Sequence, residues 1–291
     1  MSTDQSSPET NRLPVVTIVI PCYNSEQFVD KSIQSAVDQD YPFINICVVD
    51  DGSSDKSWRK IHDKFFKSMT HDKRIYRHPD IEDNIEIKAG VTENQKQLLA
   101  LRLKKNTGPS TARNIVIDYC WEMSDAYSLL DADDEYYPNK VSMCVRKWLE
   151  DPQRIGVVCT DYDTENTATG VVVSEYKEPY SQERLREECI VFSGSLISKL
   201  ALEETKEDNN YFDPNLHGPA SEDYRGSCED YDMWMRISEK FLLIHVPEIL
   251  SRYRVTGNNS SLLAHSQEST QTDAIHRMYI KMDKRRKINA S

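Results

Sequence analysis

Four carboxylates stand within five positions, from Asp131 to Glu135, directly after the apolar run 126–130. Like charges this close repel one another unless a cation lies among them. Asp131 and Asp133 are two residues apart, so in extended backbone their side chains leave the same face and can share one ligand. Oxygen ligands without Cys or His nearby favour Mg²⁺ or Mn²⁺, which also take ligands from water and substrate phosphates. The spacing predicts a divalent metal site, and the alternative is a solvated acidic turn.

Three further polar motifs each adjoin a predicted strand or helix. PCYN (21–24) follows one β-branched run, DDGSSD (50–55) follows a second, and NTGPSTARN (106–114) opens a helix. In open α/β sheets, ligands gather where the carboxyl ends of strands meet loops and helix N-termini. We therefore expect these motifs and the acidic run to outline one site.

The elements that must position these motifs alternate along the first half of the chain. Runs at 15–20, 44–51 and 126–130 are mostly apolar, as in strands buried on both faces of a sheet. Strand-then-helix repeats predict right-handed βαβ crossovers and a doubly wound α/β sheet. Three helices that follow predicted strands are each expected to bury one apolar face. The faces are Phe28, Ile33 and Val37; Ala112, Ile115, Val116, Tyr119 and Cys120; and Val141, Cys144, Val145, Trp148 and Leu149.

The pattern changes beyond residue 150. We expect a hairpin from 155–164 and 170–176, a helix over 229–241 and a strand over 242–250. The irregular stretch 175–228 should shape an acceptor pocket. The connection 68–106 is unusually long, which indicates either an added element or a surface excursion.

Composition excludes several classes of protein. The 291-residue chain has a formal net charge of -12 and a pI near 5.1, which argues against a nucleic-acid partner. Its seven cysteines are scattered without a CxxC pair, as expected of reduced core thiols rather than a disulfide frame or a zinc site. The sequence has no apolar run long enough to span a membrane and no secretory signal, so we expect a soluble, cytoplasmic protein.

Five motifs in order carry a resemblance to a known family: VTIVIPCYNSEQFVDKSIQSAVDQ, VVDDGSSD, NTGPSTARN, LLDADDEYYPNK and CEDYDMWMR. Together they resemble the inverting nucleotide-sugar glycosyltransferases of family 2, over about residues 14–256. The resemblance implies a GT-A fold, which is a Rossmann-like, mixed but mostly parallel sheet flanked by helices. It also implies a metal-dependent hexosyltransferase (EC 2.4) that moves a sugar from a nucleotide-diphosphate donor, a UDP-sugar by preference, to a glycan or other hydroxyl acceptor by single displacement.

The same resemblance implies roles for individual donor-site residues. Asp50 would accept a hydrogen bond from the base, and a helix-capping turn is the alternative for its motif. Asp131 would face the ribose, and Asp133 would bind the metal, with Asp131 as the second candidate ligand. A local surface ion pair is the alternative for Arg113. The nucleotide-sugar-binding residues that the family pattern implies are Pro21, Tyr23, Asn24, Asp50, Asp51, Asn106, Gly108, Arg113, Asp131 and Ala132.

An inverting displacement also needs a base that takes the proton of the attacking hydroxyl. Asp230 matches the family's catalytic base, with Glu229 beside it as the second catalytic candidate, although an acid at a helix start is also explained by capping. Asp223 is a weaker rival. Many relatives have a His two residues after the arginine of a late YR pair, where this chain has Thr256, so His265 or a water held by Thr256 would have to complete the metal shell.

The expected organisation is a disordered tail (1–13), one GT-A domain (14–265) and a C-terminal helix (266–291). The domain divides into a nucleotide-sugar-binding half, 14–135, and an acceptor half, 136–265. The basic end of the last helix is expected to be solvated, with a weak peripheral contact to an anionic surface as the alternative.

Three other functions are set against the transferase. A catalytically silent nucleotide-sugar or glycan binding module of the same fold is kept open by Thr256. An aspartate-nucleophile phosphatase would use LLDADD after a strand, but it should carry its nucleophile near the first strand. A nucleotidyltransferase would need a Gly-rich loop where this chain has PCYN.

Overall fold

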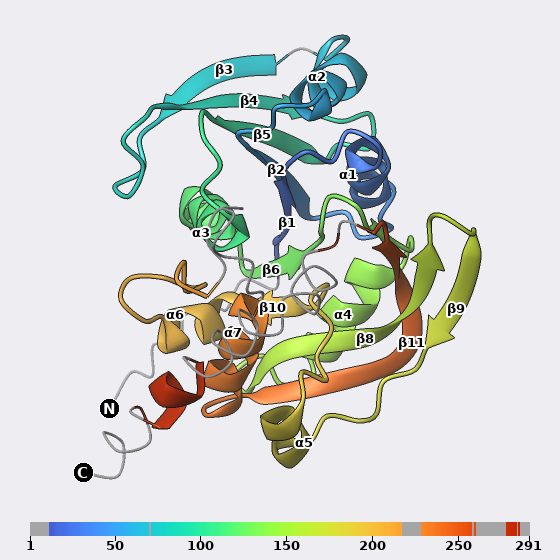
Figure 1. Ribbon diagram of the computed structural model, residues 1–291, viewed down its shortest axis with the longest axis vertical. Helices are drawn as coiled ribbons and strands as arrows, with labels where there is room; N and C mark the ends of the chain where they lie inside the picture. Colours follow the sequence, from blue (N-terminus) through green and yellow to red (C-terminus); the bar gives the residue numbers. More distant parts are fainter. Residues whose placement is uncertain are drawn as a thin grey trace, which may run out of the picture.

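The computed structural model describes residues 12–69, 71–216, 228–257, 259, 278–283 and 285. Within these residues, eleven strands form one mixed sheet in the order β3-β4-β5-β2-β1-β6-β10-β8-β11-β7, and β9 pairs with β8. Helices cover both faces of the sheet, with α3, α6 and α7 on one side and α1, α2 and α4 on the other (Figure 1). The expected mixed, mostly parallel α/β sheet flanked by helices is confirmed.

The four central strands of the first half are parallel, as the alternating pattern predicts. Each of their carboxyl ends therefore opens toward the same edge of the sheet. The strands are β5 (Gln97–Leu103), β2 (Ile44–Asp51), β1 (Val16–Cys22) and β6 (Ala126–Leu129). The crossovers contain α1 (Val29–Val37), α2 (Ser57–Ile61) with the π-helical turn η1 (His62–Phe66), and α3 (Pro109–Cys120) with the short 3₁₀ turn η2 (Trp121–Met123).

The long connection 68–106 is an added part of the sheet, and the alternative of a surface excursion is wrong. Strands β3 (His71–Tyr76) and β4 (Ile85–Val91) form an antiparallel meander with β5 and extend the sheet beyond β2. Both strands are weakly marked in the sequence, because β3 begins with four polar or charged residues and β4 alternates over only a few positions. In β4, Ile85 and Ile87 are buried, whereas charged residues occupy the positions between and after them.

The predicted hairpin of the second half is confirmed as β8 (Ile155–Asn166) and β9 (Val171–Glu175). Strand β11 (Leu242–Val255) is five residues longer than predicted and runs parallel to β8. Two short strands escaped prediction: β10 (Leu196–Ser198), which is antiparallel to both β6 and β8, and β7 (Glu135–Tyr136), which pairs with β11.

The later helices are α4 (Lys140–Trp148), α5 (Gln182–Glu187), α6 (Lys199–Thr205) and α7 (Glu229–Ser238). The face expected for α4 is buried except for Leu149, which is 43% exposed because it lies one residue beyond the helix. All seven cysteines are free thiols, and all except the half-buried Cys189 are buried, so the prediction of core thiols is confirmed.

Two parts of the expected domain organisation lie mostly outside the described residues: the tail 1–13, of which residues 12 and 13 are described, and the helix 266–291, which is helical at 278–283 and 285. In the described C-terminal piece, Met278 and Met282 are buried in the core that contains Trp234 of α7. Among the described helices, none has the length and apolar character needed to cross a membrane.

Candidate active site

Arg113, near the start of α3, joins the ends of two other elements. It is 4% exposed, and its Nη2 donates to Asp131 Oδ1 at 2.8 Å while Nη1 donates to Glu229 Oε1 at 2.5 Å. Burial opposes the charged form, but the two carboxylates outweigh it and raise the pKa of Arg113. This cation holds the end of β6 against the start of α7, so a local surface pair does not describe Arg113.

The acidic run after β6 is packed into the protein rather than solvated. Asp134 is 3% exposed and accepts from the backbone N–H of Arg254 at 2.8 Å, and Ala132 is also 3% exposed. Burial, followed by the charge of Asp131, raises the pKa of Asp133 to about 7. Burial and the charge of Asp133 raise the pKa of Asp134 as well. Ionising this run is therefore costly without a further cation.

A residue that sequence reasoning missed, Asn259, touches the expected metal ligand. Its Nδ2 lies 3.4 Å from Asp133 Oδ2 and donates to the carbonyl of Arg254 at 2.7 Å. Its Oδ1 accepts from the backbone N–H of Thr256 at 2.7 Å and from Oγ1 of the same residue at 3.2 Å. Asn259 thus stands between Thr256 and the acid. His265, proposed from the sequence, and the rival base Asp223 lie outside the described residues.

Arg254, the arginine of the late YR pair, supports the same loop. It donates to the carbonyl of Asp133 at 2.9 Å, and its guanidinium pairs with Glu135 and, at 3.2 Å, with Glu165. The backbone that carries Asp133 is thereby fixed from β11.

The donor set fits a hard cation. Asp131 and Asp133 offer carboxylate oxygens, and the raised pKa of Asp133 reflects a charge that a divalent ion would stabilise. In the described part of the chain, no three His, Cys, Asp or Glu side chains are grouped as a metal centre. Mg²⁺ or Mn²⁺ held here would therefore complete its shell with water and phosphate oxygens.

Asp50, near the end of β2, has one carboxylate oxygen that accepts no hydrogen bond from the described residues. The residue is fully buried; Oδ1 accepts from the N–H of Ser53 at 3.4 Å, and Oδ2 has no hydrogen-bond partner among the described residues. Burial raises the pKa of Asp50. Arg102 of β5 places Nε 3.6 Å from Oδ2 and lies over the ring of Trp58. Sequence reasoning missed Arg102, because its strand was not predicted. An orphan acceptor beside a cation suits a ligand that presents an N–H next to a carbonyl.

Asp51, by contrast, uses both oxygens within the protein. It accepts from the N–H and hydroxyl of Thr107, both at 2.8 Å, and from the N–H of Gly108 at 2.9 Å. Burial raises its pKa to about 6. The neighbouring Gly52 has φ +69°, and a Cβ there would lie 2.5 Å from the carbonyl carbon of Lys105. Asp51 therefore holds the loop before α3, where the half-buried Asn106 also lies.

In the motif PCYN after β1, one side chain is also used within the protein, whereas two others lie at the surface. Asn24, with φ 50°, accepts from the N–H groups of Ser54 at 2.9 Å and Asp55 at 3.3 Å, so its side chain orders the neighbouring loop. Tyr23 is 40% exposed and Pro21 is half-buried, which leaves these two side chains at the surface near the same loop.

At the start of α7, the two acids differ in environment. Glu229 is 3% exposed and is bound by Arg113. Asp230 is half-buried and has no ion-pair partner among the described residues, and burial together with the charge of Glu229 raises its pKa to about 7. A carboxylate with this pKa can accept a proton near neutral pH.

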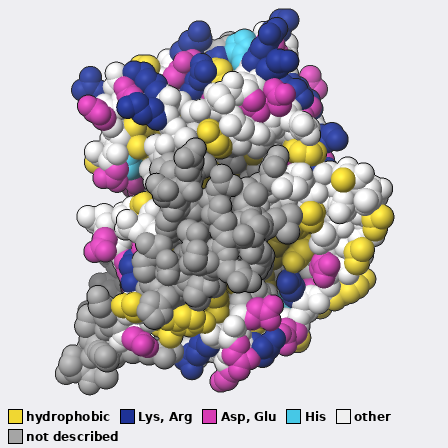
Figure 2. Space-filling view, viewed as in Figure 1, with side chains coloured by type: hydrophobic (Ala, Val, Ile, Leu, Met, Phe, Trp, Pro, Cys, Tyr) yellow, Lys and Arg dark blue, Asp and Glu magenta, His cyan; other side chains and the backbone are white. Residues whose placement is uncertain are grey.

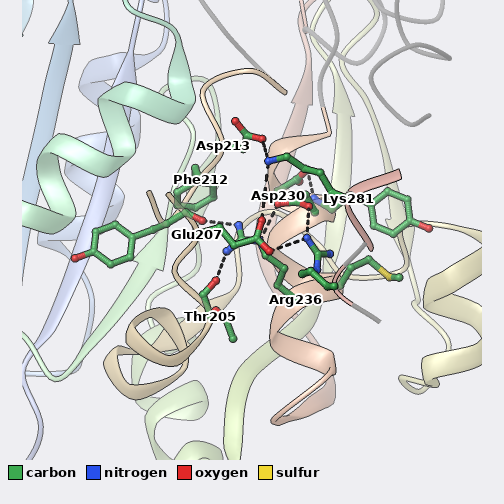
Figure 3. A network of polar contacts seen from close by, with 12 residues as sticks. Thr205, Glu207, Phe212, Asp213, Asp230, Arg236 and Lys281 are labelled. Carbon is green, nitrogen blue, oxygen red and sulfur yellow. Dashed lines mark hydrogen bonds and ion pairs between the residues drawn. The ribbon is translucent and has the colours of Figure 1, made fainter. Parts of the chain in front are cut away.

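A polar network fixes the rest of α7 (Figure 3). Arg236 pairs with Asp232 at 2.8 Å, and it donates to the carbonyls of Thr205 and Tyr211, both at 2.6 Å. Its guanidinium thus ties α7 to the end of α6 and to the loop that follows.

The C-terminal helix joins this network. Lys281 pairs with Asp213, and Arg285 pairs with Glu207 at 3.0 Å and lies 3.6 Å from Asp232. Arg285 was expected in a solvated basic end; the structure instead turns it inward, where the half-buried Glu207 and the buried Asp232 offer it partners. The other residues of that basic end lie outside the described residues.

Comparison with known proteins gives these elements a family. The model of "Glycosyl transferase family 2" matches residues 17–81 and 86–203, more than half of the chain. The chain belongs to this family. The match contains Asp50, Arg113 and Asp131, and it ends before Asp230.

Curated relatives of this family 2 glycosyltransferase include synthases of polysaccharides. It is 23% identical over 255 residues to the hyaluronan synthase of Pasteurella multocida, covering 87% of this chain and 22% of that protein. It is 23% identical over 257 residues to the chondroitin synthase of Escherichia coli, covering 88% and 31% respectively. The chain thus spans less than a third of the length of these two relatives.

Solved structures support the fold of this family 2 glycosyltransferase. TarS 1–349 from S. aureus in complex with UDP aligns with a TM-score of 0.58 at 17% identity, over 83% of this chain and 60% of that one. The mannosyltransferase PcManGT from Pyrobaculum calidifontis, in complex with GDP-Man and Mn²⁺, aligns with a TM-score of 0.58 at 14% identity, over 95% and 67%. At these identities the likeness establishes the GT-A fold alone.

Proposed function

We propose that this chain transfers a sugar from a UDP-sugar to an acceptor hydroxyl by a metal-dependent, inverting single displacement. The observation that carries the proposal is the double ion pair of Arg113, which brings Asp131 of the donor side and Glu229 of α7 to one cation. A transferase needs its donor acids and its base in one place, and Asp230 is the neighbour of Glu229.

The donor base is assigned from Asp50 and Arg102. Uracil presents one N–H flanked by carbonyls, which matches a carboxylate oxygen that accepts no hydrogen bond from the described residues and lies beside a guanidinium. Guanine would present two adjacent donors to the same acid. TarS has been solved with UDP and with UDP-GlcNAc, which agrees with this choice, whereas PcManGT was solved with GDP-Man.

The proton-transfer role falls to Asp230. Glu229 is already paired with Arg113, so it acts by positioning the start of α7, while Asp230 has a pKa of about 7 and no ion-pair partner among the described residues. Asp230 would accept the proton of the attacking hydroxyl of a glycan or other acceptor as the bond to the anomeric carbon forms.

The leaving diphosphate needs its developing charge stabilised. Asp131 and Asp133 would hold Mg²⁺ or Mn²⁺, and the bound ion would supply that stabilisation at the phosphates. Asn259 would orient Asp133, and Arg113 would keep Asp131 in place.

The competing function is a silent nucleotide-sugar binding module. Incubation with UDP-, GDP- and dTDP-sugars, each with Mn²⁺ and with EDTA, distinguishes the two by release of nucleoside diphosphate. We expect metal-dependent release from a UDP-sugar and an inverted anomeric configuration of the product by NMR. Binding of a donor without release, in the presence of a range of hydroxyl acceptors, would support the module and contradict the proposed transferase.

A further inference from the structure

Charge is distributed unevenly over the molecule. Residues 56–77, which contain α2, η1 and β3, hold eight Lys and Arg against two Asp, a net +6, in a chain whose net charge is -12. The rest of the chain therefore carries -18. Figure 2 shows dark-blue side chains gathered at the end of the molecule where Figure 1 places α2 and β3. We call residues 56–77 the cationic cap.

Several cations of the cap are available to a partner. Lys60, Lys67 and Lys73 are exposed and make no ion pair with any residue that the structure describes. The paired cations of the cap are weakly held: Arg59, 77% exposed, lies 3.2 Å from Asp63. Such exposed pairs are worth little and exchange readily for another anion.

The cap also has a shallow depression between α1 and α2. It has a volume of about 370 Å³ and is lined by four cations and two acids: Lys56, Arg59, Lys60, Lys64, Asp30 and Asp63. A cationic, solvent-facing hollow of this kind admits an anionic headgroup without the burial of a charge.

An apolar side chain projects among these cations. Lys73, Ile75 and Arg77 alternate at and just beyond β3, so they share one face, and Ile75 is 66% exposed. In the β3–β4 register Lys73 stands opposite Lys88, whose ammonium lies over the ring of Trp58 of α2. The strand face and α2 are therefore neighbours, and the basic and apolar groups form one surface.

We propose that the cationic cap docks on an anionic phospholipid surface. Each Lys or Arg near such a surface is attracted to it, and an exposed aliphatic side chain gains by entering the interface. A nucleic acid would satisfy the cations but leave Ile75 in water. The -18 on the rest of the chain is repelled by the same surface, which leaves one preferred orientation.

This orientation has a consequence for the site. The cap begins at Lys56, directly after the segment 52–55 that follows the end of β2, where Asp50 lies. Docking through the cap would hold the proposed donor pocket at the side of the molecule near the lipid headgroups.

The test is sedimentation of the full chain with vesicles of phosphatidylcholine, alone or with one third phosphatidylglycerol. We expect binding to the anionic vesicles only, lost at about 0.5 M NaCl because salt screens the attraction. The K60Q/K67Q/K73Q variant should lower the partition coefficient about 100-fold, since each cation contributes about fivefold. The I75S variant should bind more weakly with the same salt dependence.

The matched control, R146Q/K147Q/R154Q, removes three cations of α4 and its following loop with the same change in net charge. Equal vesicle binding by the two triple variants would overturn the assignment to the cap, and absence of binding to anionic vesicles at low salt would overturn the proposal itself. If the chain bound duplex DNA as strongly as the anionic vesicles, and the I75S substitution did not change that binding, the cap would be a general polyanion surface. This result would also overturn the proposal. Thermal unfolding of each variant checks that it is folded.

Discussion

The guanidinium of Arg113 lies 2.5 Å from Glu229, a residue 116 positions later in the chain. Both side chains are at most 5% exposed, and the other Nη of the same arginine is bound to Asp131. The arrangement separates the two acids at the start of α7, since it engages Glu229 and leaves Asp230, the proposed base, without an ion pair among the described residues.

Replacing Arg113 should therefore affect both stability and donor binding. Arg113→Ala leaves Glu229 buried without its cation, which costs about 3–5 kcal/mol in the free energy of unfolding. Arg113→Lys keeps the charge but cannot reach both acids with two nitrogens, so we expect an intermediate loss. Urea unfolding measures the loss of stability in each of the two variants. Arg184→Ala, which removes a cation from an exposed cluster, is the control. Full stability of Arg113→Ala would contradict the ion-pair role.

Asp230→Asn should lower kcat by about 10² or more while donor binding is retained, because the proposed base acts only in the chemical step. In the wild type, kcat should rise with pH and level off above a midpoint near 7, since Asp230 must be ionised and its pKa is raised to about 7. This rise of kcat with pH should be absent in Asp230→Asn. Retained turnover in Asp230→Asn, with loss of turnover in a stably folded Glu229→Gln, would move the role to Glu229.

Without divalent metal, Asp133 should make folding less favourable as the pH rises. Its folded pKa of about 7 lies above the ordinary aspartate value of 3.8, so from about pH 4 to 7 the folded state binds a proton that the unfolded state releases. Asp133→Asn in EDTA should raise Tm more at pH 8 than at pH 5, by about 2 °C or more, and should lose the Mn²⁺-induced shift. A wild-type Mn²⁺ shift retained by the variant would contradict the metal assignment.

Asp50 and Arg102 should control recognition of the nucleotide base. Asp50→Asn replaces half of the acceptor pair by a donor, so UDP affinity should fall by about 10- to 100-fold, as expected when a buried partner is left unpaired. Arg102→Gln should weaken UDP binding less, because this residue is partly exposed. Lys104→Gln changes an exposed cation two residues away and serves as the control. Calorimetry with UDP measures all three, and an equal Kd for Asp50→Asn would refute the base contact.

Asn259→Ala should lower the affinity for Mn²⁺ by about 10- to 100-fold, the usual effect of removing a group that orients a metal ligand. UDP binding in EDTA should not change. Thr256→Val removes one of the two hydrogen bonds to Asn259 Oδ1 and should have a smaller effect. Manganese titration followed by thermal shift separates the variants, and an effect of Thr256→Val larger than that of Asn259→Ala would assign the contact to Thr256.

The sequence predicted the elements whose burial pattern is continuous. The strands β1, β2 and β6 are buried on both faces, and α3 begins at Pro109 as expected. Strand β3 was missed because its sequence HDKRIY has four polar or charged residues in a row, and β4 because its apolar–charged alternation extends over only four residues, 85–88. Strand β10 was missed because three residues carry too little pattern to recognise.

Site residues were predicted well where the residue type alone suggests the chemistry. They were predicted less well where the hydrogen-bond partners of a side chain determine its role. Asp51 and Asn24 have the residue types of ligand contacts, yet their side chains are used by Thr107, Gly108 and the loop at 54–55. Asn259 carries no local signal, because its contact with Asp133 spans 126 positions. Long-range pairing of this kind is not encoded in spacing.

The docking of Met278, Lys281 and Arg285 against α7 and the residues after α6 also sets an order of assembly during synthesis. Domains fold as units while the chain leaves the ribosome from its N-terminus. The strands that carry Asp50 and Asp131 can pair early, but the helix that carries Asp230 gains its last buried contacts only after residue 285 has emerged. A nascent chain stalled before that point should bind nucleotide but should not turn over the donor.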